Sequence, residues 1–191
     1  MLDVHPVAVV GNSMGGTIAA LLAHRHPERV RQLAVVCASP QWGRAARSGL
    51  ARAFAGIGGR GAMELFQLSV RWGAARYVEP LARMELDDML RRADRPTMLD
   101  LYRRLAVTDL KEVLPGLRLP ALVLGGDRDR LAPPFHLRVM AAALPNSKLV
   151  VVPGAGHFLC ITHSTEMTGI LSRFLDNPEA VPGDQGHSDA G

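Results

Sequence analysis

The sequence contains few cysteines and none of the common motifs that hold a metal or a phosphate. Cys37 and Cys160 are the only two cysteines among 191 residues. No C-x-x-C pair and no H-E-x-x-H motif is present, and the glycines of residues 56–61 do not form a P-loop. Two free thiols are typical of a protein in a reducing compartment. We therefore expect no metal, no cofactor and a cytoplasmic location.

Long apolar runs and dense clusters of basic residues are also absent. No run reaches the roughly 18 apolar residues that a membrane-spanning helix needs, and the first residues show no basic segment followed by an apolar one. The formal net charge is +4, but the arginines are scattered from residue 25 to residue 173. A scattered distribution does not indicate a surface for nucleic acid. We expect neither a membrane nor a nucleic acid as partner.

The sequence does contain an alternation of short apolar runs and amphipathic segments. Apolar runs predict strands at residues 6–11, 32–37, 119–125 and 148–152. Helical spacing predicts helices at residues 14–26, 133–143 and 163–176, and a longer helical segment at 41–108. This alternation predicts an α/β fold, with a parallel sheet between two layers of helices. The polar, Pro/Gly-rich residues 177–191 predict a disordered tail.

A G-x-S-x-G motif lies between the first predicted strand and the first predicted helix. Its serine is Ser13, and its glycines are Gly11 and Gly15. We expect glycine at both positions because the strand and the helix cross closely there. Such a turn exposes a serine at the carboxyl edge of the sheet, and the N–H of Met14 can point at a developing oxyanion. The strand before the motif and the helix after it favour a nucleophile over a chance match.

A serine nucleophile needs a histidine base and usually an acid that orients it. Among seven histidines, His157 alone follows a predicted strand late in the chain, in a Pro-Gly-Ala-Gly loop. The acid is open between Asp127 and Asp129, which both follow the strand at 119–125. The spacing does not choose between these two carboxylates.

Four stretches of the chain resemble the catalytic C-terminal part of the α/β-hydrolase family. They are VVGNSMGG, HPERVRQLAVVCASP, LPALVLGGDRDRLAPP and LVVVPGAGHFLCITHS. Their order and spacing carry the resemblance over most of the chain outside the middle segment. The resemblance implies a core of residues 1–40 and 109–176, and a helical cap at 41–108.

The resemblance also implies a role for each candidate residue. Ser13 corresponds to the nucleophile and His157 to the general base. The family acid lies four residues before a proline in a G-x-x-D-x-x-x-P pattern, which selects Asp129 ahead of Pro133 and leaves Asp127 as a turn residue. Relatives that cleave carbon–halogen bonds or epoxides carry Asp at the nucleophile position. A serine there implies acyl chemistry.

The middle segment is rich in apolar residues, and its first aromatic residue, Trp42, directly follows the second strand region. An apolar cap would bind an apolar acyl group and exclude water. We expect Trp42 to form part of the pocket wall, against the simpler interpretation that it belongs to the core.

The resemblance further implies about four strands before the nucleophile strand, which here begins near residue 6. We therefore expect the chain to be a fragment. Its first strand would be an exposed edge that can pair with a second copy of the chain. The second oxyanion donor of the family would be missing, and Met14 alone would supply an N–H.

Two functions of different classes follow. The first is a serine hydrolase that cleaves an ester, a thioester or a related acyl bond of a small apolar substrate. Carbon–carbon bond hydrolysis, acyl transfer and perhydrolysis use the same kind of site and stay open. The second is a non-catalytic remnant, or an interaction module that pairs through its first strand. The activation of Ser13 distinguishes the two.

Overall fold

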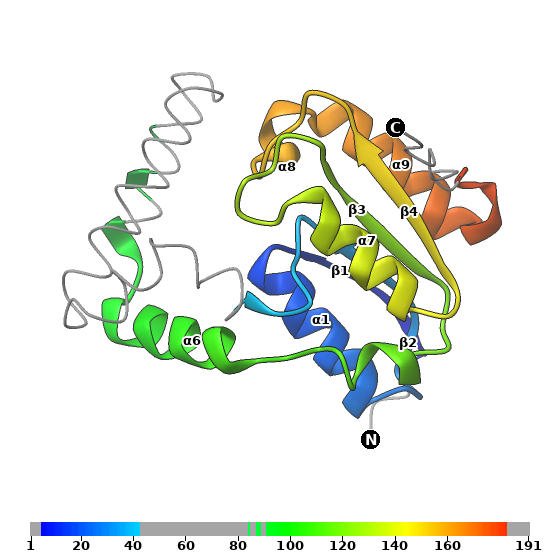
Figure 1. The fold of residues 1–191 in the computed structure, drawn as a ribbon, viewed down its shortest axis with the longest axis horizontal. Coiled ribbons are helices and arrows are strands. Elements are labelled where there is room, and N and C mark those ends of the chain that lie inside the picture. Colours follow the sequence, from blue (N-terminus) through cyan, green and yellow to red (C-terminus); the bar gives the residue numbers. More distant parts are fainter. Residues whose placement is uncertain (1–4, 43–83, 85–86, 89–90, 183–191) are drawn as a thin grey trace, which may run out of the picture.

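A computed structural model describes residues 5–42, 84, 87–88 and 91–182. Its centre is a four-stranded parallel sheet with the strand order β1-β2-β3-β4 (Figure 1). The strands are β1 (Val7–Asn12), β2 (Val30–Val36), β3 (Ala121–Gly126) and β4 (Ser147–Val152). The sheet confirms the predicted α/β fold. Each strand lies within two residues of its predicted start and end, because short β-branched runs between turn residues define these boundaries.

Helices cover both faces of the sheet, which makes three layers (Figure 1). Helices α1 (Met14–Arg25) and α7 (Pro134–Ala143) pack on one face with the 3-10 turn η1 (Leu114–Gly116). Helices α8 (Leu159–Thr162) and α9 (Ser164–Asp176) pack on the other. Within the described ranges, no helix is both long and apolar enough to cross a membrane.

Alternate side chains of each strand belong to different cores, as the pleat of a strand requires. Leu33 and Val35 of β2 face α1 and α7, whereas Ala34 and Val36 face α8 and α9. All of these residues are fully or almost fully buried. A strand buried on both faces is a continuous apolar run, which is the pattern that the sequence shows at β2 and β3.

The strand register brings four carboxyl ends to one edge of the sheet. Asn12 pairs with Val36, and Val36 pairs with Leu124. Gly126 at the end of β3 pairs with Val152 at the end of β4. The residues that follow each strand therefore leave the sheet side by side.

The middle segment begins and ends at neighbouring points of the core. Gln41 and Asp109 form an isolated antiparallel bridge, and the N–H of Leu110 donates to the carbonyl of Pro40 at 2.8 Å. Between them lies helix α6 (Arg95–Val107), which is capped by Asp94, whose carboxylate accepts from the Thr97 N–H at 3.0 Å. Residues 43–83 lie outside the described part, so the helical cap stays a prediction.

The folded core extends further than the sequence predicts. Residues Pro178–Ala180 form a 3-10 turn, η2, and Lys148 of β4 pairs with Glu179 at 3.1 Å. Val181 is 2% exposed and belongs to the core beneath α9. The prediction of a disordered tail from residue 177 is therefore wrong for residues 177–182, because one apolar side chain anchors a polar segment. Residues 183–191 lie outside the described part.

Strand β1 lies at one edge of the sheet, and in the described part of the chain it pairs with β2 alone. Two of its apolar side chains, Val7 and Val10, are 48% and 45% exposed. An apolar strand with a free row of N–H and C=O groups is a template for another strand. The location confirms the predicted edge, while its pairing with a second copy stays a prediction.

If β1 pairs with a second copy, the chain should form concentration-dependent dimers in sedimentation velocity. We expect Val10→Lys to shift the population to monomers, because a charge on an edge strand opposes strand pairing. Ile18→Lys is the matched control, since Ile18 is a 50% exposed apolar residue of α1 rather than of the strand. A wild-type chain that stays monomeric at every concentration would contradict this prediction.

Candidate active site

Ser13 occupies a strained turn between β1 and α1. Its φ of 54° and ψ of −119° lie outside the regions that a serine ordinarily adopts. The Ser13 N–H donates to the carbonyl of Val36 at 2.7 Å, so the turn is held by the neighbouring strand. Strain of this kind costs about 1–3 kcal/mol and persists only where the surrounding structure enforces it. The predicted strand–turn–helix context of Ser13 is therefore present.

The glycines around Ser13 differ from the prediction in one position. A Cβ at Gly11 would lie 2.2 Å from the carbonyl oxygen of Gly15, and a Cβ at Gly16 would lie 2.8 Å from the Cβ of Ala38. A Cβ at Gly15 would meet none of the described residues within 4 Å. The close approach of strand and helix therefore requires Gly11 and Gly16. The expectation that Gly15 is needed for space is wrong, because the described part of the chain leaves room for a Cβ at this position.

Ser13, His157 and Asp129 form a continuous hydrogen-bonded chain. The Oγ of Ser13 lies 2.9 Å from Nε2 of His157, and Nδ1 of His157 lies 2.8 Å from Oδ2 of Asp129. The Asp129 side chain is fully buried, and the His157 side chain is 14% exposed. A carboxylate only accepts, so Nδ1–H donates to Asp129 and Nε2 accepts from the serine hydroxyl. The structure thus brings together all three residues that the sequence singled out.

The structure also separates the two candidate acids. Oδ1 of Asp129 accepts from the N–H groups of Leu131 and Ala132, both at 2.8 Å, while Oδ2 faces His157. Asp127 is exposed, and its Oδ1 accepts from the Gly154 N–H at 2.7 Å. Asp127 therefore supports the loop that carries His157 without contacting the imidazole. This geometry agrees with the family pattern and not with the alternative acid.

The loops that carry Asp129 and His157 touch through their backbones. The Arg128 N–H donates to the carbonyl of Ala155 at 2.9 Å. A Cβ at Gly126, the last residue of β3, would lie 2.0 Å from the same carbonyl oxygen. Gly126 was not among the residues predicted from the sequence, although a glycine that ends a buried strand before a functional loop is the same signal as Gly11.

Met14 is the first residue of α1 and directly follows Ser13. The first N–H groups of a helix have no acceptor in their own helix. The location therefore suits an oxyanion donor, and this role stays a prediction.

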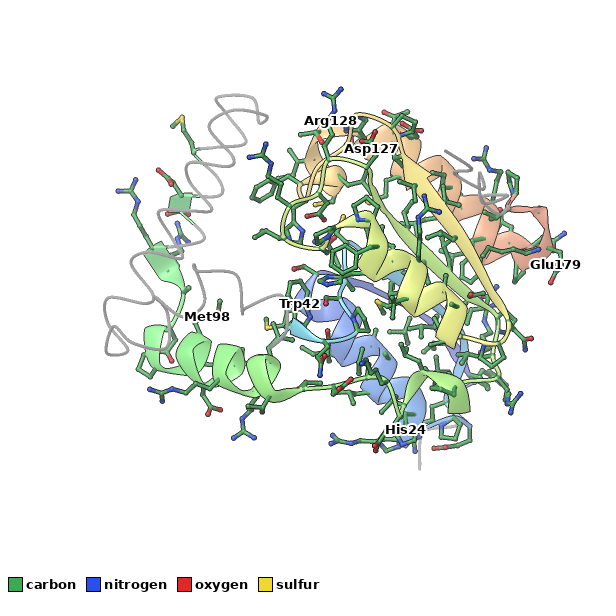
Figure 2. The ribbon with its side chains drawn as sticks, viewed as in Figure 1. His24, Trp42, Met98, Asp127, Arg128 and Glu179 are labelled. Atoms are coloured by element: carbon green, nitrogen blue, oxygen red, sulfur yellow. The ribbon has the colours of Figure 1, made fainter. Side chains whose placement is uncertain are left out.

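Trp42 lies beside α1 (Figure 2). Its indole N–H donates to the hydroxyl of Thr17 at 2.9 Å, and Thr17 is 2% exposed. Thr17 is four residues after Ser13, so the two lie on the same side of α1, one turn apart. The bond fixes the start of the middle segment close to the serine. Whether Trp42 forms the pocket wall stays a prediction.

Two further ionisable side chains lie close to Asp129. Cys37 is fully buried at the end of β2, and burial raises the pKa of its thiol. His136 in α7 is 7% exposed, and burial lowers the pKa of its imidazole, while the charge of Asp129 opposes this shift. Both groups are therefore neutral at neutral pH. Neither residue was predicted from the sequence to lie at the site, because their proximity depends on how β2 and α7 pack.

Cys37, Asp129 and His157 each offer an atom type that can bind a metal, and these atoms lie within 4.8 Å of one another. In the described residues no other such group of three occurs. Here the carboxylate and the imidazole are hydrogen-bonded to each other, and the other imidazole nitrogen faces Ser13. The hydrogen bonds from Ser13 through His157 to Asp129 therefore suit proton transfer between these side chains.

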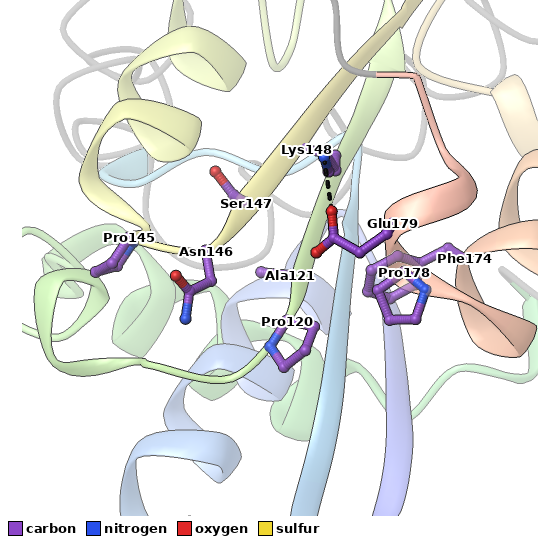
Figure 3. A pocket seen from close by; sticks show the side chains of 9 residues that line it. All are labelled: Pro120, Ala121, Pro145, Asn146, Ser147, Lys148, Phe174, Pro178 and Glu179. Carbon is purple, nitrogen blue, oxygen red and sulfur yellow. Dashed lines mark ion pairs between the residues drawn. The ribbon is translucent and has the colours of Figure 1, made fainter.

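A hollow of about 470 Å³ lies at the opposite end of the sheet (Figure 3). Pro120 and Ala121 at the start of β3 line it, together with the Lys148–Glu179 ion pair. Because β3 begins here and ends beside Asp129, this hollow lies at the end of the sheet away from the serine. It is therefore separate from the site around Ser13.

A sequence profile of the "alpha/beta hydrolase fold" family matches residues 1–164. The chain belongs to the α/β-hydrolase fold family. This membership confirms the resemblance, and the three-layer architecture is that of the family.

Curated proteins with similar sequences include two of different kinds. A pimeloyl-[acyl-carrier protein] methyl ester esterase of Xanthomonas oryzae pv. oryzae is 30% identical over 185 residues, which are 89% of this chain and 71% of the esterase. The polyketide synthase ThaQ of Burkholderia thailandensis is 31% identical over 184 residues, which are 88% of this chain and 8% of the synthase.

Among solved structures, a hydrolase from Pseudomonas aeruginosa superposes with a TM-score of 0.75 at 23% identity. The match covers 91% of this chain and 66% of the hydrolase. At this identity the likeness concerns the fold alone. The α/β-hydrolase chain spans about two thirds of the length of that structure.

The close contact at the nucleophile turn predicts a graded effect of alanine. We expect Gly11→Ala and Gly16→Ala to lower the free energy of unfolding by about 1–3 kcal/mol, since each added methyl group overlaps a neighbouring atom. Gly15→Ala is the matched control and should be neutral or stabilising by up to about 1 kcal/mol, because alanine favours a helix. Urea denaturation measures all three. Equal losses at the three positions would contradict the assigned contacts.

Proposed function

We propose that this chain is a serine hydrolase that cleaves an ester, a thioester or a related acyl bond. The observation that carries the proposal is the hydrogen-bonded line from Ser13 through His157 to the buried Asp129. Three loops from three different strands contribute one side chain each. A chance arrangement would not align a hydroxyl, both nitrogens of one imidazole and a carboxylate.

The geometry suits a two-step acyl transfer to water. Ser13 attacks the carbonyl carbon while Nε2 of His157 takes the hydroxyl proton, and Asp129 stabilises the imidazolium. The imidazolium then gives the proton to the leaving group, which departs as an alcohol or a thiol. Water, deprotonated by the same nitrogen, releases the acid and restores the serine. The N–H of Met14 binds the oxyanion of both tetrahedral intermediates.

Burial and backbone strain support this assignment. Asp129 accepts from two backbone N–H groups and from His157, so its oxygens are fixed before a substrate binds. Fixed donors and acceptors need no reorganisation during the reaction, which is a large part of enzymatic rate enhancement. The strained Ser13 holds its hydroxyl at the imidazole.

The substrate is proposed as a small apolar acyl compound. An ester is supported by the relatives named methyl ester esterases. The apolar composition of the middle segment supports an apolar acyl group. Carbon–carbon bond hydrolysis, acyl transfer and perhydrolysis begin with the same site and are the alternative reactions.

A fluorophosphonate probe tests the activation of Ser13. We expect one adduct on the wild-type chain, located on Ser13 by peptide mass, and none on Ser13→Ala. The same substitution should lower ester hydrolysis by at least about 1000-fold. Ser164→Ala is the control, because Ser164 is an exposed serine at the start of α9. A folded wild-type chain without an adduct would support the non-catalytic alternative.

The two aspartates should respond very differently to asparagine. Asp129→Asn should lower kcat by about 1000-fold or more, because the amide no longer orients the correct imidazole tautomer or stabilises its cation. Asp127→Asn should lower kcat by less than about tenfold, since it alters only an acceptor for a backbone N–H. Steady-state kinetics on one ester compare the two. Equal losses would contradict the choice of Asp129.

A further inference from the structure

The thiol of Cys37 lies close to the Asp129 carboxylate, and the proposed reaction does not use it. Cys37 is fully buried at the end of β2. Its Sγ, a carboxylate oxygen of Asp129 and a ring nitrogen of His157 all lie within 4.8 Å of one another. No solvent reaches the thiol, so its chemistry is limited to what it contacts inside the protein.

An unusual backbone conformation directs this side chain. Cys37 has a φ of 49°, and it shares the left-handed region with only one other non-glycine residue of the described chain, Ser13. In a regular strand Cys37 would face away from Val36, because successive side chains alternate. Instead both side chains belong to the core beneath α8 and α9. The turn thus rotates the thiol toward the loop that carries Asp129.

The two left-handed residues are adjacent in space. The Ser13 N–H donates to the carbonyl of Val36, and the Cys37 N–H donates to the carbonyl of Leu124 at 2.8 Å. Each strained residue directly follows a strand and is held by the next strand of the sheet. One of them aims a hydroxyl at His157, and the other aims a thiol at the acid.

The protonation state makes the thiol a donor. Burial and the charge of Asp129 both raise the pKa of Cys37. A protonated thiol can donate its hydrogen, and an ionised carboxylate can only accept one. Oδ1 of Asp129 already accepts from two N–H groups and Oδ2 from His157, and a carboxylate has about four acceptor positions.

We propose that Cys37 is a positioning residue, whose S–H donates to the Asp129 carboxylate and helps to hold Oδ2 against Nδ1 of His157. The kinetic part of this inference rests on the proposed hydrolase function. The proposed hydrogen bond does not depend on that function, and it is tested separately.

Other ionisable groups surround the pair. Cys160 of α8 is close enough that its charge would affect Cys37, and burial raises the pKa of its thiol as well. His136 approaches Asp129 from α7. The neighbouring Arg128 and Arg130 of the acid loop are exposed and do not share the buried space.

Cys37→Ala removes the donor, and Cys37→Ser replaces it with a hydroxyl. We expect kcat/KM of Cys37→Ala to fall about three- to tenfold, the usual effect of one lost hydrogen bond. The acidic limb of its pH profile should move to higher pH, because a carboxylate with one donor fewer stabilises the imidazolium more strongly. Cys37→Ser should restore both quantities, and the control Cys160→Ala should change neither.

Infrared spectroscopy of the S–H stretching band detects the bond without turnover. The band that Cys37→Ala removes should lie at lower wavenumber than the band that Cys160→Ala removes, because donation weakens the S–H bond. Asp129→Asn should move the Cys37 band to higher wavenumber, since an amide oxygen is a weaker acceptor.

The outcomes separate the two proposals. A Cys37 band that Asp129→Asn leaves unmoved overturns the positioning role. Equal losses of activity in Cys37→Ser and Cys37→Ala, with an unchanged pH profile, also overturn it. That result would mean that the Cys37 side chain acts only through packing. A wild-type chain that shows the shifted band but hydrolyses no ester keeps the hydrogen bond and overturns the proposed function instead.

Discussion

The parallel pairing of four strands is the constraint on which the site depends. Because the strands share one direction, their carboxyl ends meet at one edge, and the register sets Asn12 beside Val36 and Gly126 beside Val152. Asp129 follows Ser13 by 116 residues, and His157 follows Asp129 by 28 residues. Their side chains nevertheless lie in one hydrogen-bonded line. If one of these strands were antiparallel, the loop after it would lie at the opposite edge of the sheet, away from the other two site residues.

Glycine determines how closely these loops approach. At Gly11 and Gly126 the space for a Cβ is occupied by a carbonyl oxygen of another segment. The nucleophile turn and the acid loop are thus each held against a neighbouring backbone. Contacts between backbones are stiffer than contacts between long side chains, so the functional atoms keep their positions with few additional interactions.

A buried carboxylate is stable here only because its oxygens have partners. Burying an isolated carboxylate is very costly, and hydrogen bonding offsets this cost. Asp129 meets the requirement with two backbone N–H groups, one imidazole and, as proposed above, one thiol. The same partners orient the oxygen that faces His157, so stabilising the fold and preparing the site are one set of interactions.

The pattern of residues along the chain was sufficient for the fold class, for the strand positions, and for the serine and the histidine of the site. Short β-branched runs favour strands, and in a parallel sheet a serine or a histidine just after such a run lies at the carboxyl edge. Local pattern was not sufficient to choose between Asp127 and Asp129 without a family resemblance, to recognise Gly16 and Gly126, or to place Val181 in the core. Those outcomes depend on which segments pack together across the sheet.

The position of Cys37 also depends on packing, because its neighbours in the sequence indicate only the end of a strand. Its left-handed backbone and its contact with Asp129 were decided by tertiary structure, because only the packed sheet brings β2 under the loop after β3.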